Sequence, residues 1–136
     1  SFGQLQLQNK DLSSNMLTGK IPPYLGNLKS LVLLDLSNNF ISGPIRETLS
    51  NSEILEYFLI DDNPIKSEIP HFIGNLSNLK SVSLSGCGLI GFIPSSLSSL
   101  KKLTTLSLDN NSLSGLNPSK LALLPSLKQL SMAVEQ

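Results

Sequence analysis

A strict 24-residue period constrains this chain more than any other feature. Leucine recurs at that spacing without an insertion or deletion, and several neighbouring positions repeat with it. Periods of roughly 20 to 50 residues are typical of stacked arrays in which each unit packs on the next. The period therefore predicts one elongated domain over residues 1–136, with about five full repeats and part of a sixth. The repeats begin near Leu7, Leu31, Leu55, Leu79, Leu103 and Leu127.

Each repeat contains a segment of the type Leu-x-x-Leu-x-Leu in which apolar and polar residues alternate, and the second and fifth repeats match it in full. The substitutions in the other repeats are Lys10, Phe58, Ile60, Val82 and Met132. Alternation with period two is typical of a strand with one buried face. In the fifth repeat, Leu106 and Leu108 should point inward, whereas Ser107 and Asp109 should point outward. The return path of the chain then places the next strand alongside in parallel, about 4.8 Å away. Stacking should therefore give one continuous core, because no repeat buries its apolar edge alone.

A column of asparagines follows the strands and turns the chain out of them. An amide side chain both donates and accepts, so a buried stack of asparagines can satisfy loop backbone groups that lack partners. In the fourth repeat Cys87 takes this position, which we interpret as a small buried thiol replacing the amide. A reactive cysteine needs a partner that lowers its pKa, and the single histidine, His71, lies 16 residues earlier in a return segment. The structural column comprises Asn15, Asn39, Asn63, Cys87 and Asn111.

The repeats also match a known pattern. The segments LTTLSLDNNSLSG, LVLLDLSNNFISGPI and NMLTGKIPPYLGNLKS resemble plant-specific leucine-rich repeats, whose pattern is LxxLxLxxNxLxGxIPxxLxxLxx. The resemblance implies an α/β repeat solenoid, a right-handed superhelix with a parallel concave sheet and little helix beyond short 3-10 turns. It also implies an extracellular plant recognition role, most often in the outer domain of a receptor-like kinase or receptor-like protein. Polygalacturonase-inhibiting proteins and some plant antifreeze proteins resemble the same pattern.

The ends depart from the family pattern. Members usually cap the solenoid with cysteine pairs, and this chain has one cysteine. Lys10 occupies a core column in the first repeat, and the chain stops just after a sixth strand segment. We therefore expect a fragment of a longer chain, with uncapped ends that could favour self-association.

Composition excludes several classes of protein. Ten Lys and Arg residues balance ten Asp and Glu residues, which argues against a nucleic-acid-binding protein because such proteins usually carry a basic surplus. A content of 40% hydrophobic and 15% charged residues argues against disorder. No apolar run approaches the roughly 20 residues of a membrane-spanning helix, so we expect no membrane insertion by this segment.

Catalytic and cofactor motifs are not convincing either. One histidine and one cysteine, separated in the repeat frame, give neither a catalytic triad nor a set of metal ligands. The segment Gly86 to Gly91 matches the dinucleotide motif G-x-G-x-x-G. That motif requires a helix opening at its third glycine, whereas Gly91 is followed by Phe92-Ile93-Pro94. We therefore predict a non-enzymatic chain without a cofactor or metal, and we interpret the adjacent Asp61 and Asp62 as solvated surface residues.

Two segments match the N-glycosylation pattern, at Asn75-Leu76-Ser77 and Asn110-Asn111-Ser112. We expect Asn75 on the convex side, where a sugar fits. Asn110 should lie beside the concave face, where a sugar would obstruct binding.

The concave face is the candidate binding site. Its strand positions and their flanks carry six acidic residues against two basic ones, Lys80 and Lys128, and such a surface favours a basic partner. Apolar residues on neighbouring strands, framed by carboxylates, have the composition of a binding hot spot, although scattered apolar residues on a soluble sheet would look the same. The third repeat also departs most from the pattern, at Phe58, Pro64 and Ser67. The candidate partner-binding residues are Leu33, Asp35, Glu56, Tyr57, Leu59, Asp61, Asp62 and Asp109.

These observations favour an extracellular recognition module that binds a protein or peptide through the concave face, together with a co-receptor in the receptor setting. A free secreted inhibitor of a cell-wall hydrolase is the alternative, since an acidic face would meet a basic enzyme. A group of hydroxyl side chains, including Ser83 and Thr105, leaves an antifreeze or glycan-binding protein as a third hypothesis.

Overall fold

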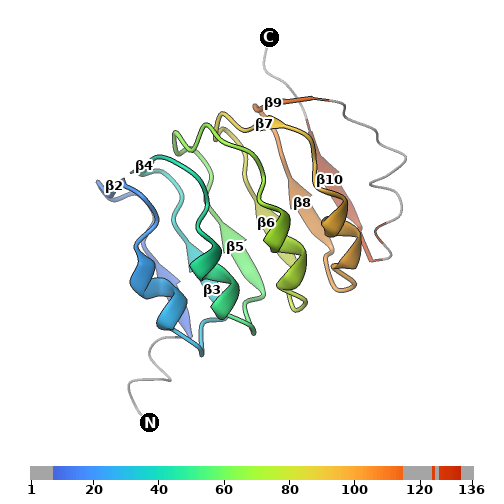
Figure 1. The fold of residues 1–136 in the computed structure, drawn as a ribbon, viewed down its shortest axis with the longest axis horizontal. Coiled ribbons are helices and arrows are strands. Elements are labelled where there is room, and N and C mark those ends of the chain that lie inside the picture. The colour runs from blue at the N-terminus through green and yellow to red at the C-terminus, as the bar shows by residue number, and fades with distance from the viewer. Residues whose placement is uncertain (1–7, 115–123, 125, 133–136) are drawn as a thin grey trace.

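A computed structural model describes residues 8–114, 124 and 126–132. Its main feature is a parallel sheet of six strands, each three residues long, in which every strand pairs with the equivalent strand of the next repeat. Each register pair is 24 residues apart, as in Asn9↔Leu33 and Leu33↔Tyr57. The sheet runs along the back of the molecule in Figure 1. Its strands are β1 (Asn9–Asp11), β3 (Leu33–Asp35), β5 (Tyr57–Leu59), β6 (Ser81–Ser83), β8 (Thr105–Ser107) and β10 (Gln129–Ser131).

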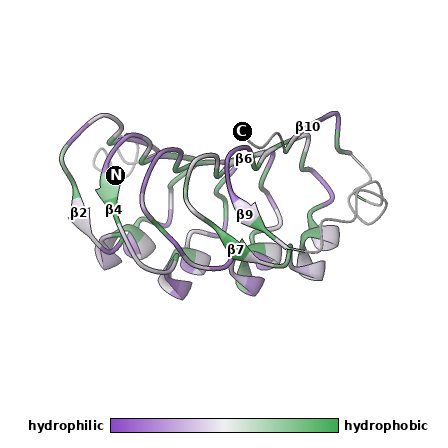
Figure 2. Cartoon of the chain, turned by 90° about the horizontal axis from the view of Figure 1, so that it is seen from above, coloured by the Kyte–Doolittle hydropathy of each residue, from purple (hydrophilic) through white to green (hydrophobic). Residues whose placement is uncertain are grey.

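Short 3-10 turns form the opposite side of the first four coils, a coil being one 24-residue repeat (Figure 2). Proline precedes three of the four turns, where its fixed φ holds the chain extended before the turn begins. Gly26 and Gly74 let neighbouring turns pack closely, because a Cβ at either would collide with a backbone carbonyl oxygen, of Thr48 or Ser96. The turns are η1 (Pro23–Asn27), η2 (Glu47–Asn51), η3 (His71–Asn75) and η4 (Ser95–Ser99).

The core fills the space between the sheet and the turns. The central residue of the strand points inward and is fully buried in three successive coils, where it is Leu34, Phe58 and Val82. Phe58 is the largest of the fully buried side chains. Lys10 takes the same position in β1 and is partly exposed. The core therefore runs continuously along the solenoid, as the sequence period predicts.

A second sheet lies along one edge of the coils and is divided into two pieces. The strand β2 (Thr18–Gly19) pairs with β4 (Phe40–Ile41), and β7 (Ile90–Gly91) pairs with β9 (Ser112–Leu113). All four strands follow the upper edge in Figure 1. The third coil contributes no strand to this sheet within the described residues, and a single bridge, Glu68↔Ile90, joins it to the fourth coil.

The division has a local cause at Pro64. The equivalent residues Phe40 and Ser112 donate their backbone N–H to the preceding coil, to Leu17 O and Leu89 O, each at 2.8 Å. Proline has no N–H to donate. The chain also turns toward the following coil, because Lys66 N–H donates to Cys87 O at 2.9 Å. In the second sheet, the backbone of the third coil is thus bonded to the fourth coil and not to the second.

The predicted solenoid with a parallel sheet and little helix is confirmed. Among the described residues the structure contains 3-10 turns and no α-helix. Over the same residues, no helix has the length and apolar character to cross a membrane.

Candidate functional site

The solvent-facing side of the main sheet, which we call the sheet face, brings together the apolar residues predicted to form a hot spot. Leu33 lies directly opposite Tyr57 on the adjacent strand, and Asp35 lies opposite Leu59. Tyr57 and Leu59 are two residues apart on β5, so their side chains share a face. Tyr57 is 36% exposed, whereas Leu33 and Leu59 are half-buried. These three side chains form one small apolar patch at the second and third coils.

An ion pair borders this patch at the beginning of the strands. Lys80 Nζ lies 2.8 Å from Glu56 Oε1. The hydrogen bond and the charge of Glu56 raise the pKa of Lys80 above its ordinary value, and Tyr57 lies close enough to contribute. The carboxylate of Glu56 is therefore already paired with a cation, so its charge is largely balanced before any partner arrives.

The remaining carboxylates gather at the other end of the strands. Parallel strands place their carboxyl ends along one edge of a sheet, and Asp11 and Asp35 end β1 and β3. Asp61 and Asp62 follow β5, and Asp109 follows β8. These five aspartates therefore lie along one edge of the sheet, which we call the acidic rim: Asp11, Asp35, Asp61, Asp62 and Asp109.

Two of these carboxylates tie neighbouring strands together. Asp61 accepts hydrogen bonds from Ser83 Oγ at 2.7 and 2.8 Å and from Ser85 N–H at 2.7 Å. Asp109 accepts from Ser131 Oγ at 2.6 Å on both carboxylate oxygens. The interpretation of Asp61 as a merely solvated residue is therefore wrong, because its carboxylate bonds to the next coil.

The carboxylates of Asp11 and Asp35 accept hydrogen bonds from residues of their own coil, and Asp62 is exposed. Asp35 accepts from Ser37 N–H at 3.0 Å. Asp11 accepts from both Oγ and N–H of Ser13, and these two bonds lower the pKa of its carboxyl. Asp62 is exposed and its backbone has a φ of 57°.

The asparagine column forms a hydrogen-bonded ladder between coils. Asn63 Nδ2 donates to Leu36 O at 2.9 Å and Ile60 O at 3.0 Å, and Asn63 Oδ1 accepts from Ile41 N–H at 3.0 Å. Asn39 and Asn111 make the equivalent bonds and are buried. Asn15 differs, because it is exposed and its amide donates only within its own coil.

Cys87 fills its place in the ladder incompletely. Its Sγ donates to Ile60 O at 3.2 Å, as an asparagine amide would. It supplies no acceptor in place of Oδ1, and the N–H of Ile65 bonds instead to Asn63 O at 2.8 Å. Burial raises the pKa of the Cys87 thiol to about 11, so the thiolate needed for nucleophilic attack is scarce at neutral pH.

Both glycosylation candidates are exposed. Asn75 ends η3 on the side of the turns. Asn110 directly follows Asp109 on the acidic rim and has a φ of 55°. No group of three or more His, Cys, Asp or Glu side chains within the described residues is arranged to hold a metal ion.

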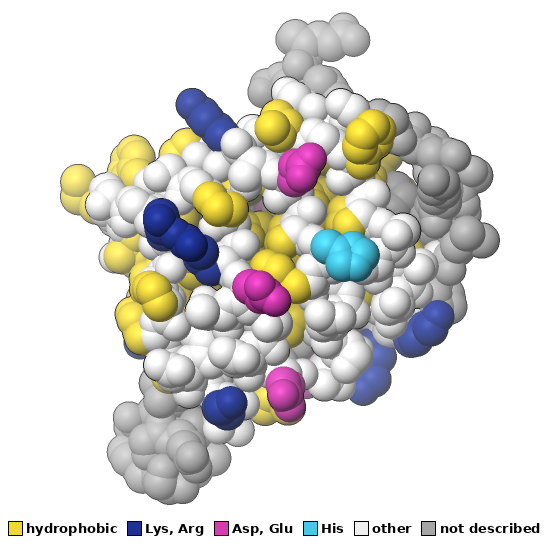
Figure 3. Space-filling model, viewed as in Figure 1, with side chains coloured by type: hydrophobic (Ala, Val, Ile, Leu, Met, Phe, Trp, Pro, Cys, Tyr) yellow, Lys and Arg dark blue, Asp and Glu magenta, His cyan; other side chains and the backbone are white. Residues whose placement is uncertain are grey.

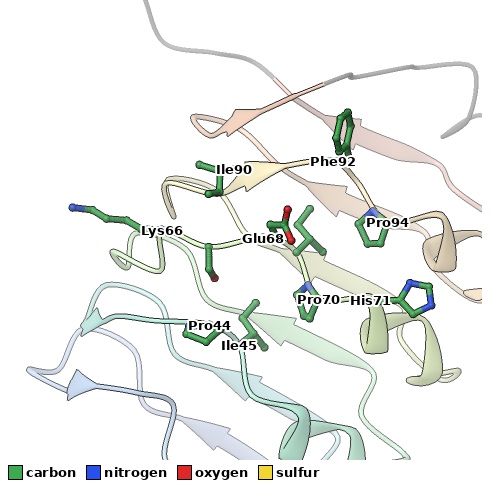
Figure 4. Close-up of a pocket in the computed structure, with 11 residues that line it drawn as sticks. Pro44, Ile45, Lys66, Glu68, Pro70, His71, Ile90, Phe92 and Pro94 are labelled. Atoms are coloured by element: carbon green, nitrogen blue, oxygen red, sulfur yellow. The ribbon is translucent and has the colours of Figure 1, made fainter.

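Sequence reasoning missed a cavity beside the divided second sheet. It has a volume of about 690 Å³, and Pro44, Ile45, Glu68, Pro70, Ile90 and Phe92 are among the residues that line it. We call this site the lateral groove (Figure 4). Its signal in the sequence is the pair of large apolar residues, Ile90 and Phe92, that flank the repeat glycine Gly91 on the side away from the core.

Family models described as leucine-rich repeat match residues 11–28, 30–52 and 70–134. No curated protein sequence matches the chain. Solved structures do match. The ectodomain of the Arabidopsis receptor kinase HAESA, in complex with an N-terminally extended IDA peptide hormone, is 36% identical with a TM-score of 0.85, over 94% of this chain and 22% of that one.

Two further structures are similar. The plant peptide hormone receptor RGFR1 in complex with RGF2 is 32% identical, with a TM-score of 0.83, over 90% of this chain and 21% of that one. The BIR2 ectodomain from Arabidopsis thaliana is 32% identical, with a TM-score of 0.78, over 90% of this chain and 67% of that one. The present chain thus spans about a fifth of the length of the HAESA and RGFR1 chains. What it matches in HAESA and BIR2 is the non-catalytic ectodomain.

Proposed function

Because the chain belongs to the leucine-rich-repeat family, we propose that it is a ligand-binding stretch of the extracellular domain of a plant receptor. In this proposal it recognises a protein or peptide, and the sheet face makes the contact. Support comes from solved ectodomains of similar sequence that hold peptide hormones, among them HAESA with IDA and the co-receptor SERK1 and RGFR1 with RGF2.

The observation that carries the proposal is the apolar patch of Leu33, Tyr57 and Leu59 beside the acidic rim. An exposed aromatic side chain on a rigid sheet provides contact area at little cost in conformational entropy. Among the described residues that face outward on the strands of the main sheet or directly precede those strands, Lys128 is the basic residue outside the ion pair that opposes the five rim aspartates. A peptide with apolar and basic side chains would therefore find both kinds of contact within one short stretch of sheet.

The experiment selects peptides from a random displayed library against the 136-residue chain and measures their affinity for two tyrosine variants. Tyr57→Ala removes the aromatic residue of the patch and should weaken binding tenfold or more, as expected for a hot spot. Tyr24→Ala is the matched control, because Tyr24 is 51% exposed but lies on η1. Peptides whose affinity is unchanged by Tyr57→Ala and reduced by Tyr24→Ala would contradict the proposal.

Salt dependence tests the acidic rim separately. The selected peptides should be rich in Lys or Arg, and raising the ionic strength should slow their association because salt screens the attraction. Asp62→Asn should have the same effect on a smaller scale, since Asp62 is exposed. An association rate that does not change with salt would reject electrostatic steering and leave the apolar contact standing alone.

A further inference from the structure

The lateral groove lies away from the sheet face, on the side of the molecule that carries the second sheet and the 3-10 turns (Figures 1 and 3). Pro44 and Ile45 of the second coil form one wall, and Ile90 and Phe92 of the fourth coil form the other. Glu68 and Pro70 of the third coil lie between them. A volume of about 690 Å³ falls within the range of roughly 300 to 1,000 Å³ typical of binding sites for small ligands.

The groove occurs where the second sheet is divided. In the described structure no backbone hydrogen bond joins residues 64–69 to β4, whereas Lys66 N–H and Ser67 O both bond to the fourth coil. The side chain at position 67 adds to this difference, because Ser67 stands where Gly19, Gly43 and Gly91 adopt positive φ. The third coil therefore follows a different path from its neighbours, and the walls on either side stand above it.

The wall formed by the fourth coil exposes its large apolar side chains more than the sheet face does, whereas Ile45 in the opposite wall is buried. Phe92 is 69% exposed and Ile90 is 49% exposed, compared with 36% for Tyr57. Both side chains belong to one short segment and line the same cavity. Figure 3 shows hydrophobic side chains on this face close to acidic ones, and Figure 4 places His71 next to Pro70 at the border of the groove. A clustered apolar surface with a polar border is the usual mark of an interaction site.

Two polar side chains of the groove, Glu68 and Ser67, lack partners within the described residues, and the carboxylate of Glu68 is a strong acceptor. The carboxylate of Glu68 makes no hydrogen bond or ion pair within the described residues, and it lies over Gly91, where a Cβ would collide with Glu68 Oε1. Ser67 Oγ is buried without a hydrogen-bond partner. Lys66 points away from the groove in Figure 4, whereas Glu68 lies between its walls. A complementary ligand must therefore bring hydrogen-bond donors and positive charge.

We propose that the lateral groove binds an extended basic segment of a partner protein, with an arginine side chain paired to Glu68. A guanidinium group offers five donors in a planar fork, which suits a carboxylate. Its methylene stem would lie on Pro44 and Ile90, and its plane could stack on Phe92. Apolar residues next to the arginine would cover the remaining walls. This site is independent of the sheet face.

The test uses a blocked pentapeptide of sequence proline–leucine–arginine–leucine–proline, with a citrulline peptide as the neutral control. Backbone amide NMR signals of the 136-residue chain are followed during titration. The arginine peptide should shift the signals of Glu68, Ile90 and Phe92 saturably, and the citrulline peptide should bind at least tenfold more weakly, because hydrogen bonds between charged groups are the stronger ones.

Variants separate the groove from general electrostatics. Glu68→Gln keeps the size of the side chain and should weaken the arginine peptide at least tenfold. Glu47→Gln is the matched control on the exposed turn η2 and should leave affinity unchanged, as should Tyr57→Ala on the sheet face. Equal affinity of wild type and Glu68→Gln would overturn the proposal. Shifts confined to the strands of the main sheet would overturn it too, because the peptide would then bind the sheet face. Shifts that depend on protein concentration in the absence of peptide would also overturn it, because the groove would then be a contact between copies of the chain.

Discussion

The two sheets of this protein are built from the same coils with the same period, yet one is continuous and the other is divided. The main sheet joins six strands although the central residue of the strand differs between coils. In the first four coils this residue is Lys10, Leu34, Phe58 and Val82. The second sheet has no strand in the third coil, where Pro64 stands. The difference shows that pairing in the main sheet tolerates varied side chains because each residue supplies its own N–H. Pairing in the second sheet depends on single residues.

The largest expected effect comes from a residue that serves both sheets. Asn63 Nδ2 bonds to carbonyl groups that follow main-sheet strands, and its Oδ1 accepts from Ile41 in β4. Asn63→Ala leaves the buried N–H of Ile41 without its partner, at about 1 to 3 kcal/mol. It also removes one hydrogen bond each from Leu36 O and Ile60 O, which keep bonds from Asn39 and Cys87. With about 0.5 to 1.5 kcal/mol for each of these lost bonds, the free energy of unfolding should fall by about 3 kcal/mol in urea denaturation. Asn15→Ala is the control, because Asn15 is exposed, and it should cost less than about 1 kcal/mol. Equal losses would mean that the ladder adds nothing beyond local turns.

An intermediate effect on stability is expected at Cys87, which makes fewer side-chain hydrogen bonds than the buried asparagines of the ladder. Its pKa rises from 9.0 to about 11 on folding, so the folded state holds the thiol proton more tightly than the unfolded state. The corresponding stability is fully present below pH 9 and is lost as the pH rises toward 11. The loss should be on the order of 2 kcal/mol relative to Cys87→Ser, measured by denaturant unfolding at several pH values. Parallel curves for the two proteins would show that the thiol does not titrate differently on folding.

The smallest effect on stability tests the cause of the division itself. Pro64→Ala restores an N–H group, whose new hydrogen bond of about 0.5 to 1.5 kcal/mol opposes a loss of about 0.4 to 1 kcal/mol in chain stiffness. The net change in unfolding free energy should stay within about 1 kcal/mol. Hydrogen exchange is the sharper measurement, because the amide of residue 64 should be protected if the second sheet becomes continuous.

Adding Ser67→Gly to Pro64→Ala sharpens this comparison. Three coils that contribute a strand to the second sheet have glycine at the position of Ser67, namely Gly19, Gly43 and Gly91. Greater protection in the double variant would assign the division to both residues. No protection in either variant would assign it to the bond between Lys66 N–H and Cys87 O.

The period was enough to predict the solenoid, the parallel strands and the buried positions. Every coil repeats the same burial requirement, so Leu34, Leu36 and Asn39 are fixed by pattern alone. The bonds of Asp61 were not predictable in this way, because they depend on which side chains of the next strand lie within reach, here Ser83 and Ser85.

The lateral groove escaped sequence reasoning for a related reason. Pro64 and Ser67 were evident as departures from the pattern, but their effect lies in hydrogen bonds that are missing between coils. The depth of the groove also depends on how far Ile90 and Phe92 stand above the third coil, which requires coordinates. The glycosylation of Asn75 and Asn110 and the ligand contacts of the sheet face remain predictions.

The backward reach of the asparagine ladder sets an order for folding during synthesis. Asn39 donates to Leu12 O and Asn63 to Leu36 O, in each case 27 residues earlier in the chain. The asparagine of the same coil already donates to this carbonyl group, as Asn15 does to Leu12 O and Asn39 to Leu36 O. A newly made coil therefore lacks the second hydrogen bond to this carbonyl group until the asparagine of the next coil has left the ribosome. At about 5 to 20 residues per second, that wait is roughly one to five seconds per coil. The solenoid would then close from its first coil onward, each coil being completed by the one translated after it.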